Sequence, residues 1–350
     1  MQGSVIQSFE SVAVSTRIRL ARNFREYPFP NLLIKSPHAE EMSEEMVSIL
    51  CAELDPIDDF VLYHIKDLSD DDAAFLKERN LVSRDLILNR RISAALVSED
   101  ESISVMINEE DHVREQYFMK GFDLEKAYER VAGIDDVISE CIPFAFDEQF
   151  GYLTACPTNL GTGLRASVML FLPAVSRRGL MRRISSDLAR GGLTVRGAFG
   201  EGSGNEGDLF QISNEMTLGH SEEVILRQVD QAVSTMVELE IRERERMKAE
   251  GGVALRDKVR RALGVLLNCC TVGEDEFKLK IADVKLGLAL GILGSVKGGE
   301  RSMSELDDLL IAMRPANINR LCGETLPREE QDIYRAENVV RALGEMKLYY

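Results

Sequence analysis

Alternating apolar and polar residues predict four half-buried strands in this chain. Successive side chains of a strand point to opposite faces, so a period of two indicates one packed and one polar face. The pattern occurs in SVAVSTRIRL (residues 11–20), SISVMI (102–107), GLTVRGAFG (192–200) and DLFQISNEMTL (208–218). Helical stretches are predicted over residues 39–52, 124–141, 163–175 and 177–190. Because these elements do not alternate regularly, we predict an α+β fold with a largely antiparallel sheet flanked by helices.

A long helix is predicted over residues 221–250. Ser221 suits the N-cap, acidic residues follow it, and Ile225 and Val229 begin an apolar stripe at helical spacing. Two glycines, Gly251 and Gly252, suit the end of that helix. The sequence beyond them shows helical spacing over residues 255–268, 281–293, 302–313 and 329–346. We therefore predict a large domain at residues 11–250 and a small all-helical domain at residues 253–350.

Composition and charge narrow the classes of partner. The 350 residues are 45% hydrophobic and 29% charged, with a net charge of −17, which argues against nucleic acid or an anionic membrane as partner. No basic start leads into an apolar leader, and no stretch approaches the roughly 20 apolar residues that span a bilayer. We expect a cytoplasmic protein. The six cysteines are scattered without a C-x-x-C pair and only four histidines occur, so no metal site is predicted.

Four arginines in STRIRLARNFR (residues 15–25) form the first candidate site in this acidic protein. Arg17 and Arg19 would share one face of a strand. Arginine grips phosphate oxygens bidentately and keeps its charge, so the pair suits a polyphosphate. The alternative is a pair of surface arginines bound to nearby acids.

A second candidate is CPTNLGTGLRAS (residues 156–167), read as a glycine turn that starts a helix. Backbone amides near Thr162 and Gly163 would then face an anion, with Arg165 adding charge. An ordinary helix start explains the pattern equally well. Cys156 has no base nearby in sequence, so we assign it no covalent role.

Two further segments hold acids beside arginine. MINEEDHVRE (residues 106–115) ends a strand in Glu109, Glu110 and Asp111, which suits either a solvated turn or a site for a cation. VRGAFGEGSGNEGD (residues 195–208) follows a strand with five glycines and charges of both signs. Such loops often close over reacting phosphates, and the alternative is a plain hairpin connection.

Five of these motifs, in order, resemble the catalytic domain of the phosphagen (guanidino) kinases: STRIRLARN, NEEDHVR, CPTNLGTGLRAS, VRGAFGEG and ISNEMTLG. Within that group the chain is similar to the bacterial protein arginine kinases of the McsB family. Its arginine strand lies near the N-terminus, where creatine and free-arginine kinases have a preceding capping domain. Ala198 and Phe199 follow VRG, and a helical domain containing PREEQDIYRAE follows Gly252.

The resemblance implies transfer of the γ-phosphoryl group of Mg-ATP to arginine side chains of proteins. It places the catalytic carboxylates at Glu110 and Glu201, with Mg2+ arriving on ATP through phosphates and water. The arginines that would bind the phosphates are Arg17, Arg19, Arg114, Arg165 and Arg196. The full ATP-binding set it implies is Ser15, Thr16, Arg17, Ile18, Arg19, Asn80, Arg114, Arg165, Ala166, Ser167, Val168, Met169, Arg196, Gly197, Ala198, Phe199 and Gly200.

Two positions depart from the family pattern. Asn80 stands where members usually have a histidine beside the adenine, so ring stacking on the base is lost. In the C-terminal domain the family's phosphoarginine pocket carries Arg-Asp-x-x-Arg-Ala, and this chain has Gln331, Asp332, Arg335 and Ala336. One phosphate clamp is therefore missing from a degenerate pocket.

The resemblance also implies partners. Family members mark substrates for Clp-type proteolysis in the stress response and work with a zinc-binding activator, and we expect a homodimer or higher oligomer. Two other functions remain open. The chain could phosphorylate a free guanidino compound, or it could be a non-catalytic adaptor that binds phosphoarginine.

Overall fold

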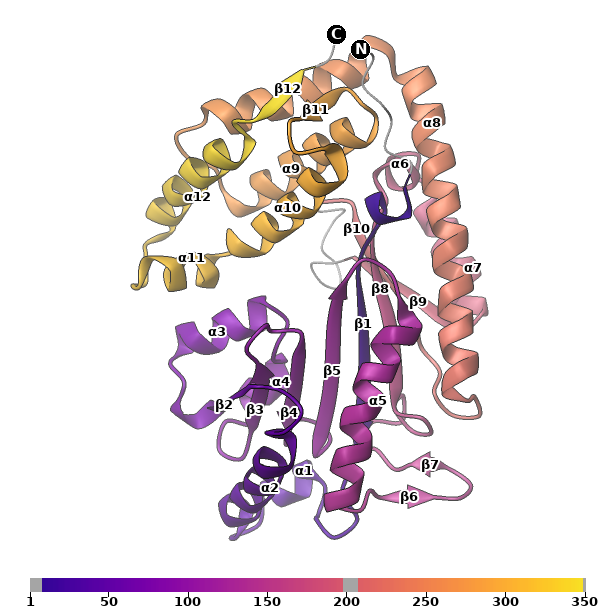
Figure 1. Ribbon diagram of the computed structural model, residues 1–350, viewed down its shortest axis with the longest axis vertical. Helices are drawn as coiled ribbons and strands as arrows, with labels where there is room; N and C mark the ends of the chain where they lie inside the picture. The colour runs from indigo at the N-terminus through magenta and orange to yellow at the C-terminus, as the bar shows by residue number, and fades with distance from the viewer. Residues whose placement is uncertain (1–7, 198–206, 349–350) are drawn as a thin grey trace.

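The chain folds around one antiparallel sheet, seen in a computed structural model that describes residues 8–197 and 207–348 (Figure 1). In that part of the chain the sheet has eight strands in the order β2-β3-β4-β5-β1-β8-β10-β9. Each neighbouring pair is antiparallel. The strands are β1 (Ala13–Arg22), β2 (Phe60–His64), β3 (Ala94–Ser98), β4 (Ile103–Ile107), β5 (Val113–Lys120), β8 (Leu164–Phe171), β9 (Leu193–Gly197) and β10 (Leu209–Asn214). The predicted α+β class is confirmed.

Two helices, α5 (Leu124–Cys141) and α8 (Glu222–Asn268), lie along one face of the central strands (Figure 1). Alternate residues of β1, Ile18 and Leu20, are buried in the apolar core that these helices help to form. The smaller elements are α1 (Pro30–Leu33), α2 (Ala39–Leu54), α3 (Asp70–Glu78), α4 (Arg84–Leu88), α6 (Pro173–Arg177), α7 (Met181–Arg190) and the hairpin β6 (Phe146–Asp147) and β7 (Gly151–Tyr152). Helices α5 and α8 thus cover one face of the central strands, while α3 and α4 pack on the opposite face of β3 and β4.

The helix predicted over residues 163–175 is wrong, because most of this segment is the central strand β8. Its even-numbered residues, Leu164, Ala166, Val168 and Leu170, are fully buried on the helix-covered face. The buried side chains therefore follow a period of two, with Arg165, Ser167 and Met169 between them on the other face. The true helix, α6, begins only at Pro173, at the first helical position that proline favours.

The glycine pair after the long helix makes a kink rather than an end. Gly252 has φ 48° and ψ −139°, and helix α8 continues beyond it to Asn268. Glycine adopts this left-handed φ without a steric penalty, so the chain changes direction there while keeping most helical hydrogen bonds. The predicted boundary between the large and the small domain falls at this kink.

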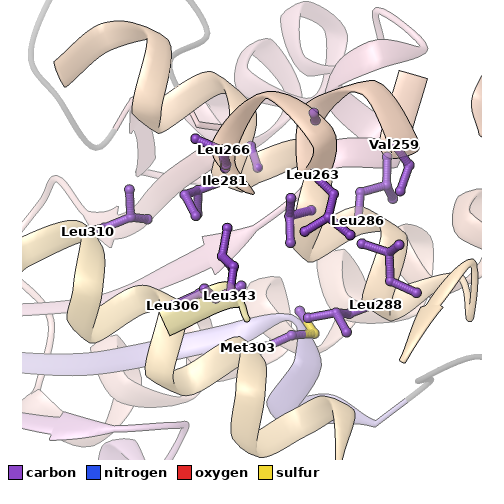
Figure 2. Close-up of a cluster of buried hydrophobic side chains, with 14 of the residues drawn as sticks. Val259, Leu263, Leu266, Ile281, Leu286, Leu288, Met303, Leu306, Leu310 and Leu343 are labelled. Atoms are coloured by element: carbon purple, nitrogen blue, oxygen red, sulfur yellow. The ribbon is translucent and has the colours of Figure 1, made fainter. Parts of the chain in front are cut away.

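The C-terminal region packs four further helices on the end of α8. They are α9 (Glu274–Ala289), α10 (Gly299–Ala312), α11 (Pro315–Cys322) and α12 (Arg328–Leu343). Figure 2 shows Leu263, Leu286, Leu306 and Leu343 converging in their shared core. A ribbon of β11 (Leu293–Ser295) and β12 (Met346–Leu348) corrects the all-helical prediction, since Gly291, at φ 69°, turns the chain after α9 into an extended segment.

None of the helices in the described residues combines the length and the apolar character needed to cross a membrane.

Candidate active site

Strand register brings five arginines to the face of the sheet opposite α5 and α8. Arg19 of β1 lies directly opposite Arg165 of β8, and Ala21 lies opposite Arg114 of β5. Residues that oppose each other point to the same face, as do residues two apart. Arg17 lies two residues before Arg19 and so points to the same face. Arg196 lies opposite Gln211, which in turn lies opposite Met169 of β8, so Arg196 also points to this face. We call Arg17, Arg19, Arg114, Arg165 and Arg196 the arginine face.

Electrostatic repulsion within the arginine face is largely uncompensated. Burial, together with Arg114 and Arg165, lowers the pKa of Arg17 to about 9, and burial with the neighbouring arginines lowers the pKa of Arg19 well below its usual value. Burial and Arg196 also lower the pKa of Arg165. Among the described residues, the buried Nε atoms of Arg17, Arg19 and Arg165 have no hydrogen-bond partner. Unpaired cationic donors of this kind fit a ligand with several negative charges.

The acidic stretch before β5 divides into two structural carboxylates and one exposed carboxylate. Glu109 is buried and accepts a hydrogen bond of 2.6 Å from Nη1 of Arg114 and another from Ser83. Asp111 is buried and accepts 2.6 Å bonds from Nδ2 of Asn23 and from the amide of Ala155. Both carboxylates therefore hold the turn.

Glu110 instead turns outward beside the arginine face, with its side chain 41% exposed. Its Oε2 lies 3.6 Å from Nη2 of Arg114. Burial and the neighbouring Asp111 raise the pKa of Glu110, although Arg114 acts in the opposite sense. A carboxylate with a raised pKa is a better proton acceptor, and an exposed one can also bind a cation.

The glycine turn at residues 160–163 packs against neighbouring backbone and does not start a helix. Gly163 has φ 63°, and a Cβ there would lie 2.5 Å from the carbonyl oxygen of Ala21. Gly161 has φ 107°, and a Cβ there would lie similarly close to the carbonyl oxygen of Thr217. The predicted anion site at a helix N-terminus is therefore wrong, because β8 follows the turn. The glycines let the turn approach β1, and the adjacent Arg165 contributes its side chain to the arginine face.

A pocket of about 570 Å3 lies beside the arginine face. Six residues of the predicted ATP-binding set line it: Ser15, Arg17, Asn80, Ser167, Met169 and Gly197. Asn80 has φ 62°, a left-handed conformation that asparagine tolerates better than most residues. Phe118 also lines the pocket, and the guanidinium of Arg17 lies 4.8 Å from its ring centroid. Apolar surface next to several cations suits a nucleotide.

Other predicted nucleotide residues face away from this pocket. Thr16, Ile18, Ala166 and Val168 are fully buried on the helix-covered face. Their side chains hold β1 and β8 against the helices, which keeps the intervening arginines in register. The predicted residues Ala198, Phe199, Gly200 and Glu201, and most of the predicted glycine lid, lie outside the described residues.

The residues of the C-terminal motif at positions 331–336 form contacts with other parts of the protein. Gln331 donates its amide to Oδ1 of Asn319 at 2.9 Å and to the Leu326 carbonyl at 3.1 Å. Arg335 is buried, pairs with Asp332 at 2.5 Å and donates to two backbone carbonyls. Ala336 belongs to the apolar core. The guanidinium of Arg335 therefore has a structural role.

Sequence reasoning missed Gln116, which connects Arg17 of the arginine face to Asn80 in the wall of the pocket. Its Oε1 accepts a 2.6 Å hydrogen bond from Nη2 of Arg17, and its Nε2 donates to the carbonyl of Asn80 at 2.9 Å. Gln116 lies two residues after Arg114, so the alternation of β5 would have placed it on this face. Among the described residues, no group of three or more His, Cys, Asp or Glu side chains could hold a metal ion.

Two protein-family models match this chain. A model of the ATP:guanido phosphotransferase C-terminal catalytic domain matches residues 41–243, and one of the protein-arginine kinase McsB C-terminal domain matches residues 252–348. A protein-arginine kinase of Caldanaerobacter subterraneus subsp. tengcongensis is 37% identical, covering 97% of this chain and 99% of that protein. One from Clostridium kluyveri is 39% identical, covering 95% of each.

The fold has a counterpart among solved structures. The crystal structure of lombricine kinase superimposes with a TM-score of 0.57 at 23% identity, covering 68% of this chain and 71% of that one. Together with the matches along nearly the whole sequence, this shows that the chain belongs to the protein-arginine kinases of the ATP:guanido phosphotransferase family.

Proposed function

We propose that this protein transfers the γ-phosphoryl group of Mg-ATP to arginine side chains of proteins. The observation that supports the proposal is the arginine face, in which the buried Nε atoms of Arg17, Arg19 and Arg165 have no hydrogen-bond partner among the described residues, with the exposed carboxylate of Glu110 at its edge. Anion-binding and cation-binding groups therefore lie side by side. A phosphoryl transfer from a nucleotide to a guanidinium needs both.

The arginine face would bind the phosphates and stabilise the charge that builds up during transfer. Phosphoryl transfer relies mainly on positioning and electrostatic stabilisation, and fixed guanidinium groups supply both. Because Arg17, Arg19 and Arg165 lie on adjacent strands, their positions are set before ATP binds. Mg2+ would enter with ATP, bound by phosphates and water, and would neutralise further charge.

The carboxylates would prepare the substrate arginine. Its guanidinium is protonated at physiological pH, so one nitrogen must lose a proton as it attacks the γ-phosphorus and the bond to the β-phosphate oxygen breaks. Glu110 would orient that guanidinium and accept the proton. We assign the role of the second catalytic carboxylate to Glu201, and this assignment rests on the family pattern alone.

The cellular role forms a further part of the proposal. Phosphoarginine on proteins would mark them for Clp-type proteolysis in the stress response, with a zinc-binding activator protein as partner and a homodimer or higher oligomer as the active form. These assignments, and a cytoplasmic location, rest on the family resemblance.

A labelling experiment tests the transfer. The purified protein is incubated with ATP, Mg2+ and an unfolded arginine-rich protein, and acid-labile phosphate on arginine is measured by mass spectrometry. We expect Glu110→Gln to reduce the initial rate on the order of 10²- to 10⁴-fold, the usual contribution of a positioned acid–base group. Glu125→Gln, an exposed acid at the start of α5, is the matched control.

Three outcomes would count against the proposal. Equal labelling by wild type and Glu110→Gln would show that Glu110 has no catalytic role. Faster turnover on free arginine or creatine than on protein would favour the kinase of a free guanidino compound, and binding of phosphoarginine without any transfer would favour an adaptor.

A further inference from the structure

We propose that the C-terminal helical domain forms one wall of the nucleotide pocket and that Glu78 couples this wall to the phosphate-binding arginines. The inference rests on the proposed function, since it assumes that the pocket beside the arginine face holds the nucleotide. It assigns a positioning role to Glu78 and a nucleotide contact to helix α10.

Helix α10 supplies the wall. Asp308 and Ile311, one turn apart on α10, line the pocket together with Arg17, Asn80 and Phe118 of the catalytic domain. Lys120, at the end of β5, binds Asp308 at 2.6 Å across the two domains. A nucleotide in this pocket would therefore contact residues from both domains. Figure 1 shows the C-terminal helices above the sheet on the side of α3.

Glu78, at the end of α3, holds the neighbouring helix α11. Its carboxylate accepts hydrogen bonds of 3.0 and 3.1 Å from the backbone amides of Ala316 and Asn317, in the first turn of α11, and one of 3.0 Å from Nδ2 of Asn317. Arg314 donates to the backbone carbonyl of Glu78. An acidic side chain on free amides at a helix start is a favourable, charge-assisted contact. We call this set of contacts the Glu78 clamp.

The residues directly after Glu78 belong to the pocket. Arg79 lines it, pairs with Glu101, and donates to Oδ1 of Asn317 at 3.4 Å. The carbonyl of Asn80 accepts from Gln116, whose Oε1 accepts from Arg17. A continuous chain of hydrogen bonds and two peptide links thus joins α11 of the C-terminal domain to the arginine face.

This arrangement makes nucleotide binding and domain docking reinforce each other. If the docked C-terminal domain improves ATP affinity, ATP must by linkage stabilise docking by the same factor. Loss of the Glu78 clamp should therefore weaken ATP binding although Glu78 does not line the pocket. The chemical step should change little, because the arginine face and Glu110 stay in place.

Nucleotide affinity tests the wall and the clamp separately. Kd for ATP is measured by calorimetry on the full chain for wild type, Ile311→Arg and Glu78→Ala. We expect each variant to raise Kd about tenfold, the equivalent of about 1.4 kcal/mol. The matched controls are Ser304→Arg, an exposed site one turn before Asp308 on α10, and Lys77→Ala, an exposed site next to Glu78. Both should bind ATP like wild type.

A second readout separates positioning from general destabilisation. In wild type, ATP should slow hydrogen exchange of the α11 amides, and in Glu78→Ala this protection should be lost. In kinase assays the KM for ATP should rise while kcat at saturating ATP stays within about twofold of wild type. Glu78→Gln keeps one acceptor oxygen and should fall between Glu78→Ala and wild type.

Wild-type ATP affinity in both Ile311→Arg and Glu78→Ala would overturn the inference. So would ATP protection of α11 that persists in Glu78→Ala. Failure of wild type itself to bind ATP is a different result, because it would reject the proposed function and this inference with it.

Discussion

Two arginines on opposite faces of strand β1 have contrasting surroundings. Arg22 points toward α5, where Asp135 accepts bonds of 2.9 Å from its Nε and Nη2. Burial works against the charge of Arg22, but the attraction and hydrogen bonds of Asp135 outweigh it and raise its pKa. Arg19, three residues earlier, has a buried Nε without a partner in the described residues, and burial and neighbouring arginines lower its pKa.

The difference separates a structural arginine from a ligand-binding one. Arg244 on α8 repeats the first type, since it is fully buried and pairs with Glu240 at 2.7 Å. Stability alone would favour a carboxylate beside each buried guanidinium, as at Arg22 and Arg244. In the arginine face only Arg114 has a buried carboxylate of this kind, Glu109, among the contacts described above, whereas the buried Nε atoms of Arg17, Arg19 and Arg165 have no hydrogen-bond partner in the described residues. Repulsion among these arginines lowers the stability of the folded protein, and a bound polyphosphate would relieve it.

The largest expected effect comes from breaking the structural pair. Arg22→Ala should lower the free energy of unfolding by about 3–5 kcal/mol, because it leaves Asp135 buried without its cation. Denaturant unfolding of wild type and variant measures this loss. The folded fraction should keep its ATP affinity. A loss below about 1 kcal/mol would show that Arg22 and Asp135 are not a structural pair.

Removal of an arginine from the ligand-binding face should have the opposite profile. Arg19→Ala should reduce the phosphorylation rate on the order of 10²- to 10³-fold, as loss of one preorganised group that stabilises developing charge does. Its free energy of unfolding should stay equal or rise, because repulsion with Arg17 and Arg165 is relieved. Rate assays and denaturant unfolding of one preparation measure both quantities. A variant that loses stability and keeps its rate would contradict the assignment.

The third prediction concerns a buried carboxyl group without a cation of its own. Burial and the nearby Asp135 raise the pKa of Glu115 well above its usual value, while Arg22 opposes them. The folded chain therefore binds a proton that the unfolded chain releases, so wild-type stability falls as pH rises from the unfolded pKa, near 4.5, toward the raised folded one.

Glu115→Gln removes this titration. Relative to wild type, the variant should gain stability with rising pH, by up to about 1.4 kcal/mol per pH unit within that window. Urea unfolding between pH 5 and 8 measures the difference, with the exposed Glu125→Gln as control. A difference that does not change with pH would mean that Glu115 is ionised in the folded protein.

The smallest expected effect is at Asn80. Asn80→His should lower the Kd for ATP about two- to fivefold, because an imidazole ring adds stacking on the base, worth well under 1.4 kcal/mol here. Histidine tolerates the left-handed φ of this position. Calorimetry measures the affinity. Asn80→Ala serves as the control without a ring, and equal affinities for the histidine and alanine variants would show that the base does not lie at residue 80.

Sequence patterns predicted some strands better than others. β1 and β4 have clear alternation, whereas the patterns do not predict β2, β3 and β5 as strands, and the acidic motif lies in the turn before β5. β3 is buried on both faces and therefore lacks a polar period. β2 lies at the sheet edge with Val61 and Leu62 exposed, so its apolar positions do not mark a buried face. β8 was mistaken for a helix because short apolar runs fit both periods.

The order of motifs along the chain was enough to indicate the family, the antiparallel class and the candidate residues, because each motif is local and carries its own chemistry. Strand alternation also placed Arg17 and Arg19 on one face. Their partners could not be predicted in this way. Arg165 and Arg114 meet Arg19 through pairings across about 100 to 150 residues, which only the register of the folded sheet determines. The same applies to the wall that α10 adds to the pocket and to the Glu78 clamp, since contacts between domains depend on packing that no local pattern encodes.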